Sequence, residues 1–292
     1  MIYDLPDIRD AGDRHLLAYF GDELNLDLNF TAQALGQRIT EAQLPGIVDL
    51  VPHFASLMVQ YDPDAISRAD LETEMVRLAE GVRSFDEIVL DSRLVSMPVV
   101  FFDPWTRDCI ADYCRSMRQK EFDVDLLVRI NQLSGPDELK AVYSATEHWV
   151  TSVGFRPGLP MFLPLDPRSR LKAPKYDPPR TWTPRGAVGI GGAAMGLYAA
   201  PSAGGYQLFG RTPWPAWDIE RRYPPFHENA CLFRPGDRLR IVPISLEEYA
   251  MIEARLAEGS YVFNIVSYQK FSVGDYKKWL TTIDVGQRLR TP

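Results

Sequence analysis

The chain has 292 residues, of which 46% are hydrophobic and 24% are charged, a balance typical of a folded globular protein. Its formal net charge of −7 argues against nucleic acid as a partner, because nucleic-acid binding needs a basic surface. No apolar run approaches the roughly 20 residues of a membrane span. The acidic start "MIYDLPDIRDAGD" is also unlike a signal peptide. We therefore expect a cytoplasmic protein that binds neither nucleic acid nor membrane.

The cysteines and histidines show no spacing typical of a metal site. Cys109, Cys114 and Cys231 form no CxxC pair, and reduced packing thiols are favoured over a disulfide or a metal site. The four histidines show neither HExxH nor HxH spacing, so we expect no zinc site. His148, beside Trp149 in a segment with helical spacing, is expected to be a packed histidine with a satisfied ring.

The first hundred residues alternate strand and helix signals. In chain order we expect a strand at 14–21, a helix at 27–43, two strands within 47–63, a helix at 68–84 and a strand-like stretch at 86–102. Ser67 is expected to cap the second helix. The order β-α-β-β-α-β is that of the ferredoxin-like sandwich. The sequence therefore predicts a ferredoxin-like α+β domain over residues 1–95.

A second domain is expected over residues 96–292. Its expected parts are a helix at 103–119, helical spacing over 122–154 that is interrupted at Ser134-Gly135-Pro136, an extended strap at 157–184, strand-sized pieces from Ala187 onward and a capped helix at 245–261. The strap holds eight of the 23 prolines, which favour extended backbone over helix. The short strands, separated by Gly, Pro and Ser turns, indicate an all-β barrel or sandwich.

Residues 181–212 carry eight of the chain's twenty glycines, and no charged residue lies between Arg185 and Arg211. So much glycine excludes a helix, while glycines in a strand-rich region often mark bulges and barrel corners that need no ligand. The pair Gly191-Gly192 suggests a phosphate cradle only weakly, since neither GxGxxG nor GxxxxGK[ST] with a following helix is present. Composition alone favours ordinary barrel structure.

The order of residues in this region carries more information. The segments "TPRGAVGIGG", "SAGGYQLFGRTPWPAWD" and "LFRPGDRLRIVPIS" resemble the allophanate hydrolase subunit 1 family. That family includes the carboxyltransferase half of urea carboxylase and the B-type subunit of the ATP-dependent 5-oxoprolinase. Further matching segments are "GDRHLLAYFGDELN", "LPGIVDLVPHFASLMVQYDP" and the strap, so the resemblance covers most of the chain. The stretches "LDPRSRL" and "KYDPPRTWTP" look nearer to urea carboxylase.

The resemblance implies an N-terminal ferredoxin-like domain followed by a C-terminal cyclophilin-like β-barrel. It also implies a partner, carboxyltransferase or allophanate hydrolase subunit 2, with the site between the two proteins. The sequence contains no Met-Lys-Met biotinylation site, nucleotide-binding domain or amidase Ser-Ser-Lys signature. The resemblance to urea carboxylase implies biotin as the cofactor, and without a biotinylation site in this sequence we expect it as carboxybiotin on a separate biotin carrier protein, with a biotin carboxylase subunit as a further partner.

Transfer of a carboxyl group to a urea-like or amide nitrogen needs aimed donors for developing charge, and a base near the acceptor N–H. Glycine suits such a site because backbone N–H groups can approach a planar ligand closely. On the motif "GGYQLFGRT", the resemblance puts Tyr206, Gln207 and Arg211 near the site. The Gln207 amide suits a ureido group and the Arg211 fork suits a carboxylate. The alternatives are a core role for Tyr206 and a salt bridge from Arg211 to Asp218 or Asp237.

Asp166, in "PLDPR", could orient acceptor N–H groups, although Asp before Pro is also an ordinary turn former. The expected catalytic residues are therefore Gln207, Arg211 and Asp166. The expected substrate-binding residues are Gly191, Gly192, Gly204, Gly205, Tyr206 and Arg185.

One departure from the family bears on the substrate. Where urea carboxylases have a Tyr-Met-Cys run after the double glycine, this chain has Ala193-Ala194-Met195-Gly196, so the pocket is expected to admit an acceptor larger or less polar than urea. The resemblance implies a subunit of a biotin-dependent carboxyltransferase that transfers a carboxyl group from carboxybiotin to a urea-like, guanidine-like or amide nitrogen. Two other functions stay open: the B-type subunit of an ATP-dependent 5-oxoprolinase or lactamase, and a binding-type regulator that resembles a sporulation-kinase inhibitor. A proline isomerase is suggested only by analogy with the cyclophilin-like barrel.

Overall fold

The computed structural model describes residues 2–82 and 84–289. The chain divides into two compact units: a first unit of residues 1–93 with 268–284, and a second unit of 94–267 with 285–292. The segment 268–284, which the sequence-based division assigns to the second domain, thus groups with the first. Arg83, inside the helix expected at 68–84, lies outside the described residues. No helix in the described part of the chain is long and apolar enough to cross a membrane.

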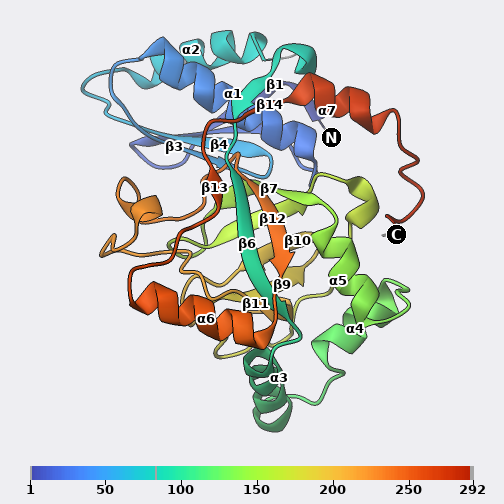
Figure 1. The fold of residues 1–292 in the computed structure, drawn as a ribbon. Helices are drawn as coiled ribbons and strands as arrows, with labels where there is room; N and C mark the ends of the chain where they lie inside the picture. The colour runs from blue at the N-terminus through green and yellow to red at the C-terminus, as the bar shows by residue number, and fades with distance from the viewer. Residues whose placement is uncertain (1, 83, 290–292) are drawn as a thin grey trace. The chain divides into compact units, whose positions relative to one another are not determined.

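The first unit contains a four-stranded antiparallel sheet in the order β1-β2-β4-β3 (Figure 1). Its strands are β1 (Ile2–Asp10), β2 (His15–Gly21), β3 (Ile47–His53) and β4 (Ser56–Tyr61). Helices α1 (Leu26–Ala42) and α2 (Arg68–Glu80) pack on the sheet through alternate apolar residues such as Leu16, Leu57 and Val59. The side chain of Ser67 caps α2 as expected, because it accepts a hydrogen bond from the Asp70 N–H.

The ferredoxin-like sheet is confirmed, but the source of its outer strand is not the expected one. The outer position beside β2 is filled by β1, which comes from the N-terminus rather than from a strand after α2. The stretch 86–102 divides instead between β5 (Val89–Asp91), which pairs with β14 (Lys270–Ser272), and β6 (Leu94–Phe101), which joins the barrel. The residues of β6 are mostly buried on both of its faces, as in a strand covered on both sides, which suits a barrel wall better than a two-layer edge. Helix α7 (Val273–Leu280) follows β14.

The second unit contains a closed seven-stranded β-barrel (Figure 1). The strand order is β11-β9-β10-β8-β7-β12-β6, and β6 pairs back to β11; β13 adds to β6. The remaining barrel strands are β7 (Glu147–Val153), β8 (Pro160–Pro164), β9 (Ala187–Gly191), β10 (Ala194–Leu197), β11 (Gln207–Arg211), β12 (Arg238–Pro243) and β13 (Ile265–Val266). Only β6 and β12 pair in parallel among the described strands. The expected C-terminal barrel is therefore confirmed.

Alternate residues such as Phe162, Val188, Ile190 and Phe209 form the barrel core. Helices around the barrel are α3 (Pro104–Ser116), α4 (Asp123–Ile130), α5 (Pro136–Ser144) and α6 (Leu246–Ala257). Short 3-10 turns are η1 (Phe85–Glu87), η2 (Pro167–Ser169) and η3 (Pro224–Phe226).

The helix expected to continue to residue 154 is wrong, because residues 147–153 form strand β7. Five consecutive residues of this strand, 148–152, are buried although three of them are polar, and periodicity alone cannot separate such a strand from a buried helix. His148 therefore lies on a strand. It is fully buried, and its Nε2 lies 2.8 Å from the Tyr143 carbonyl oxygen, which fits a ring that donates from Nε2. Its Nδ1 has no hydrogen-bond partner among the described residues, so the ring is packed as expected but satisfied at one nitrogen only.

Candidate functional site

The glycine run leaves room for two tyrosine side chains of the protein itself. A Cβ on Gly191 would lie 2.4 Å from Cδ1 of Tyr206, and one on Gly196 would lie 3.0 Å from Cε2 of the same ring. A Cβ on Gly204 would lie 2.3 Å from the hydroxyl oxygen of Tyr198. Glycines on β9, β10 and the loop before β11 therefore form a shallow wall against which Tyr206 and Tyr198 lie.

Other glycines in the run serve the barrel backbone or face open space. A Cβ on Gly189 would lie 2.6 Å from the Gln207 carbonyl oxygen, and Gly210 is similarly crowded by β6. Gly192 has a φ of 66°, and a Cβ added there would meet no heavy atom within 4 Å, while Gly205 makes ordinary contacts. The bulge and corner role that composition favoured therefore applies to part of the run.

Beside the two tyrosines lies a cavity of about 160 Å³, here called the Tyr206 pocket. Its lining includes Phe155, Met161, Lys175, Tyr198, Gly205 and Tyr206. Lys175 is the one charged side chain among the described lining residues, and its Nζ lies 5.5 Å from the centroid of the Tyr206 ring. A mainly apolar hollow with a few polar groups is typical of a small-molecule site.

The polar groups of the pocket are held in defined states. Burial raises the pKa of both Tyr198 and Tyr206, so their phenols are neutral near pH 7 and can donate hydrogen bonds. Within the described residues, no group of three or more His, Cys, Asp or Glu side chains could hold a metal ion. The pocket therefore offers an ammonium group and two phenols, and its walls are largely apolar.

Arg180, from the strap, lies beneath this wall and is 2% exposed. Its Nη1 donates to the Tyr206 carbonyl oxygen over 2.7 Å, and its Nη2 donates to the Tyr198 hydroxyl over 3.4 Å. Thr183 Oγ1 accepts from the same guanidinium at 3.3 Å. The hydrogen-bond acceptors of Arg180 among the described residues are neutral groups, which is unusual for a buried cation.

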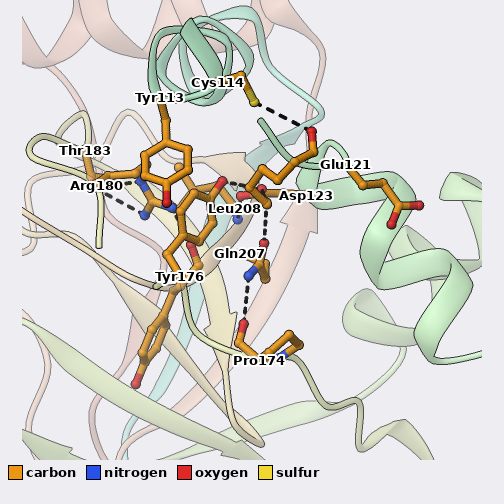
Figure 2. A network of polar contacts seen from close by, with 12 residues as sticks. Tyr113, Cys114, Glu121, Asp123, Pro174, Tyr176, Arg180, Thr183, Gln207 and Leu208 are labelled. Carbon is orange, nitrogen blue, oxygen red and sulfur yellow. Dashed lines mark hydrogen bonds and ion pairs between the residues drawn. The ribbon is translucent and has the colours of Figure 1, made fainter. Parts of the chain in front are cut away.

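A second polar cluster lies beside the first and is centred on Asp123, whose side chain is wholly buried (Figure 2). Its carboxylate accepts hydrogen bonds from the Tyr176 hydroxyl, from Lys120 Nζ and, over 2.6 Å, from the Leu208 N–H. The Tyr176 ring also lies under two cations, with Lys120 Nζ at 4.0 Å and Arg180 Cζ at 4.3 Å from its centroid. The cluster joins α4, the strap and β11.

Gln207, an expected catalytic residue, belongs to this cluster and is 1% exposed. Its Oε1 accepts from Lys120 Nζ over 2.9 Å, and its Nε2 donates to the Pro174 carbonyl over 2.7 Å (Figure 2). Both ends of the amide are therefore engaged by the protein, and its orientation is fixed.

Arg211 and Arg185 lie together at the other end of β11. Arg211 Nε donates to the Arg185 carbonyl over 2.8 Å, and its guanidinium lies 4.7 Å from the centroid of the Trp105 ring. The acids considered as salt-bridge partners bond elsewhere: Asp218 pairs with Arg222 at 3.2 Å, and Asp237 accepts from the Arg234 N–H.

Asp166 occupies the position of a turn former. Its carboxylate accepts from the Arg168 N–H at the start of η2 and pairs with the Arg168 guanidinium at 2.7 Å. Its own N–H donates to Thr146 Oγ1. These bonds tie Asp166 to its own turn rather than to the Tyr206 pocket.

Residues 6–227 match the family model described as the carboxyltransferase domain, subdomain C and D. The chain belongs to this family.

Relatives of this carboxyltransferase-domain protein fall into two groups. It is 31% identical over 278 residues to the urea amidolyase of Saccharomyces cerevisiae, and the matched region covers 93% of this chain and 15% of that protein. It is 30% identical over 259 residues to the B-type subunit of the Bacillus subtilis 5-oxoprolinase, and the matched region covers 83% of this chain and 94% of that protein. The structure of Kluyveromyces lactis urea carboxylase matches with a TM-score of 0.82 at 27% identity, covering 97% of this chain and 26% of that one. The chain thus spans only a small part of the urea amidolyase and urea carboxylase relatives.

In this carboxyltransferase domain, the expected site residues lie in separate places. The pocket brings together Gly204, Gly205 and Tyr206, with Gly191 beneath the Tyr206 ring. The other expected residues form their hydrogen bonds and ion pairs outside the Tyr206 pocket; they are Gln207, Arg185, Arg211, Asp166 and Gly192. Sequence reasoning missed four residues around the pocket, namely Phe155, Lys175, Arg180 and Tyr198. Arg180 and Lys175 lie in the proline-rich strap, where no periodicity indicates which side chains turn inward.

Proposed function

We propose that this protein is a non-autonomous subunit of a biotin-linked carboxyltransferase that transfers a carboxyl group to a urea-, guanidine- or amide-type nitrogen. In this proposal a subunit 2-type protein completes the site, and separate proteins supply the biotin carrier and the biotin carboxylase. The similarity to urea amidolyase over 93% of the chain supports this role. The chain spans 15% of that relative, so the whole activity of urea amidolyase is carried over to it only as part of this proposal.

The Tyr206 pocket is the observation that carries the proposal. Its volume of about 160 Å³ is close to that of an engineered cavity, about 150 Å³, that binds benzene, so it suits a guest with one small ring. A flat cyclic urea such as the biotin ring fits this size and the polar groups present. Biotin, when bound, supplies the carboxyl group that is transferred.

The chain's own residues would hold and orient the reacting groups. Lys175 would attract a carboxylate, and the neutral phenols of Tyr198 and Tyr206 would donate hydrogen bonds to a ureido or amide oxygen. Apolar walls such as Phe155 and Met161 would exclude water, which strengthens these interactions. Gln207, which the motif leads us to expect near the site, would act indirectly, because its two hydrogen bonds fix the start of β11.

The rim of the pocket favours a partner protein. Phe155 is 75% exposed and has a φ of 68°, a conformation rare for a bulky residue. Strained backbone tends to lie at functional sites, and exposed aromatic residues are enriched in protein interfaces. A subunit that packs on Phe155 would also close the pocket from solvent.

The B-type subunit of an ATP-dependent 5-oxoprolinase is the second candidate. It is favoured by the match to the Bacillus subtilis relative, which covers 94% of that protein and 83% of this chain at 30% identity. A lactam that carries a carboxylate would suit the same pocket. This function needs no biotin.

Purification of this chain with a tag from its native host, followed by detection of biotin in the companions, separates these candidates. The proposal predicts a stable complex with a subunit 2-type protein and a biotinylated carrier. A stable complex without a biotinylated protein would overturn it and favour the second candidate. Recovery of the chain without any companion would contradict both.

A further inference from the structure

The Tyr206 pocket is positively charged although the whole chain is acidic. The formal net charge is −7, yet the described lining of this pocket contains an ammonium group, Lys175, and no carboxylate. At the rim, the Arg156 guanidinium lies 5.9 Å from the centroid of the Phe155 ring. Charge of one sign around a cavity with low-dielectric walls raises the local concentration of ions of the opposite sign.

Arg180 adds a third positive charge below the pocket floor. It is buried and bonds to neutral oxygens of Tyr206, Tyr198 and Thr183. Its hydrogen bond to the Tyr198 hydroxyl oxygen polarises that phenol and makes its O–H a stronger donor.

Asp123, a buried carboxylate in this region, forms no hydrogen bond or ion pair with Arg180 among the described contacts. Asp123 accepts bonds from Lys120, Tyr176 and Leu208, so the charge of this carboxylate is paired with Lys120. The guanidinium of Arg180 is thus left without a carboxylate among its recorded bonds. A buried cation in this position lowers the energy of an anion placed above it.

We infer that the Tyr206 pocket selects a flat, carboxylate-bearing guest over a neutral or cationic guest of the same shape. Lys175 contacts the carboxylate, and Arg180 is a positioning residue that acts through Tyr198 and the Tyr206 backbone. The pocket therefore takes the carboxylated reactant, whereas a guanidinium acceptor binds outside it. The selectivity can be measured by binding to this chain alone. Only the identity of the carboxylated reactant rests on the proposed function.

Benzoate, benzamide and benzamidine test this selectivity because they share one ring and nearly one shape but carry charges of −1, 0 and +1. Their affinities for the purified chain can be measured by ligand-observed NMR or calorimetry. We expect the affinity order benzoate, benzamide, benzamidine, with about tenfold or more between the first and the last. Benzoate binding should weaken as salt is raised, and it should shift the amide signals of Gly204 and Gly205 but not that of Gly12, in the first unit.

The variant Lys175→Gln, with Lys172→Gln as its matched control, tests whether the Lys175 ammonium is the charge that favours benzoate. Both residues are exposed lysines of the strap, but only Lys175 lines the pocket. We expect Lys175→Gln to weaken benzoate by about three- to tenfold and to leave benzamide unchanged, while Lys172→Gln changes neither. Equal affinities for benzoate and benzamide, or equal effects of the two lysine variants, would overturn the inference. Failure to find a biotinylated companion would contradict the proposed function and leave this selectivity standing.

Discussion

Arg180 donates from Nη1 to the carbonyl oxygen of Tyr206 over 2.7 Å, and this bond joins the proline-rich strap to the residue that precedes strand β11. The same guanidinium lies 4.3 Å from the centroid of the Tyr176 ring, whose hydroxyl bonds to Asp123. One buried cation therefore connects the floor of the Tyr206 pocket with the cluster around Asp123. The strap, which has little regular structure, is held in place by side chains of this kind.

Replacement of Arg180 by Met should destabilise the second unit. The Tyr206 carbonyl and the Thr183 hydroxyl would lose a charged donor while they stay buried, so the free energy of unfolding should fall by about 3 kcal/mol. Urea unfolding measures this change. The exposed Arg170→Met variant serves as a control and should stay within about 0.5 kcal/mol of the wild type. Similar losses in both variants would contradict a special role for Arg180.

Substitution of Gly191 by Ala should be unfavourable because of the Tyr206 ring. The new Cβ would lie 2.4 Å from that ring, so the ring must move, and we expect a loss of about 1–3 kcal/mol. The same substitution in a Tyr206→Ala background should be nearly neutral, which a double-mutant cycle would measure. Gly154→Ala is the control, since no heavy atom would lie within 4 Å of its Cβ. If Tyr206→Ala fails to relieve the loss, the glycine is needed for another reason.

His148 should make stability depend on pH. Burial lowers its pKa to about 4, from an ordinary value of about 6.5, so the folded state holds the ring neutral while the unfolded state gains a proton first. Its effect is absent above pH 6.5, and stability is lost as the pH falls from there toward 4. At pH 5 this residue should lower the free energy of unfolding by about 2 kcal/mol relative to pH 7.5.

Unfolding of wild type and His148→Gln at the two pH values tests this dependence. The variant should lose about 2 kcal/mol less between pH 7.5 and pH 5 than the wild type does. His227→Gln, at an exposed histidine, should keep the wild-type dependence. An unchanged pH dependence in His148→Gln would show that this ring is not the titrating group.

Phe155→Ser should weaken the complex without harming the fold. The side chain is 75% exposed, so its removal should change the free energy of unfolding by less than about 0.5 kcal/mol. If a partner packs on it, as proposed, association should weaken by about tenfold or more in a pull-down titration. Val262→Ser, at another highly exposed apolar residue, is the matched control. Undiminished association of the Phe155 variant would contradict an interface at this rim.

The fold was predictable wherever the hydrophobic periodicity agrees with the capping and turn residues. Ser67 and Ser245 cap helices as expected, and the short strands from Ala187 onward form barrel wall. The sequence misled where burial removes periodicity. Strand β7 is buried along five consecutive residues, a burial pattern shared by buried helices, and β6, which was expected to pair in the first sheet, joins the barrel wall and is mostly buried on both faces.

The site was only partly predictable, because its polar groups come from segments without regular structure. The motif "GGYQLFGRT" pointed to Gly204, Gly205 and Tyr206, which do line the pocket. The room left by Gly191 is taken by the Tyr206 ring, a long-range contact that no local pattern reveals. Asp166 was expected to orient acceptor N–H groups, but its carboxylate is bonded to Arg168 instead. The Asp-Pro-Arg spacing permits this bond as well.

Carboxyl transfer by the native complex tests the central proposal, that the Tyr206 pocket of this chain holds the carboxylated reactant. The measurement is incorporation of labelled bicarbonate into urea and bulkier amides by complexes purified with wild-type, Lys175→Gln or Lys172→Gln chains. We predict that Lys175→Gln lowers incorporation by about tenfold or more, that Lys172→Gln leaves it unchanged, and that amides larger than urea are accepted. Equal incorporation with the two lysine variants, or no incorporation into any of these acceptors by the wild-type complex, would contradict the account.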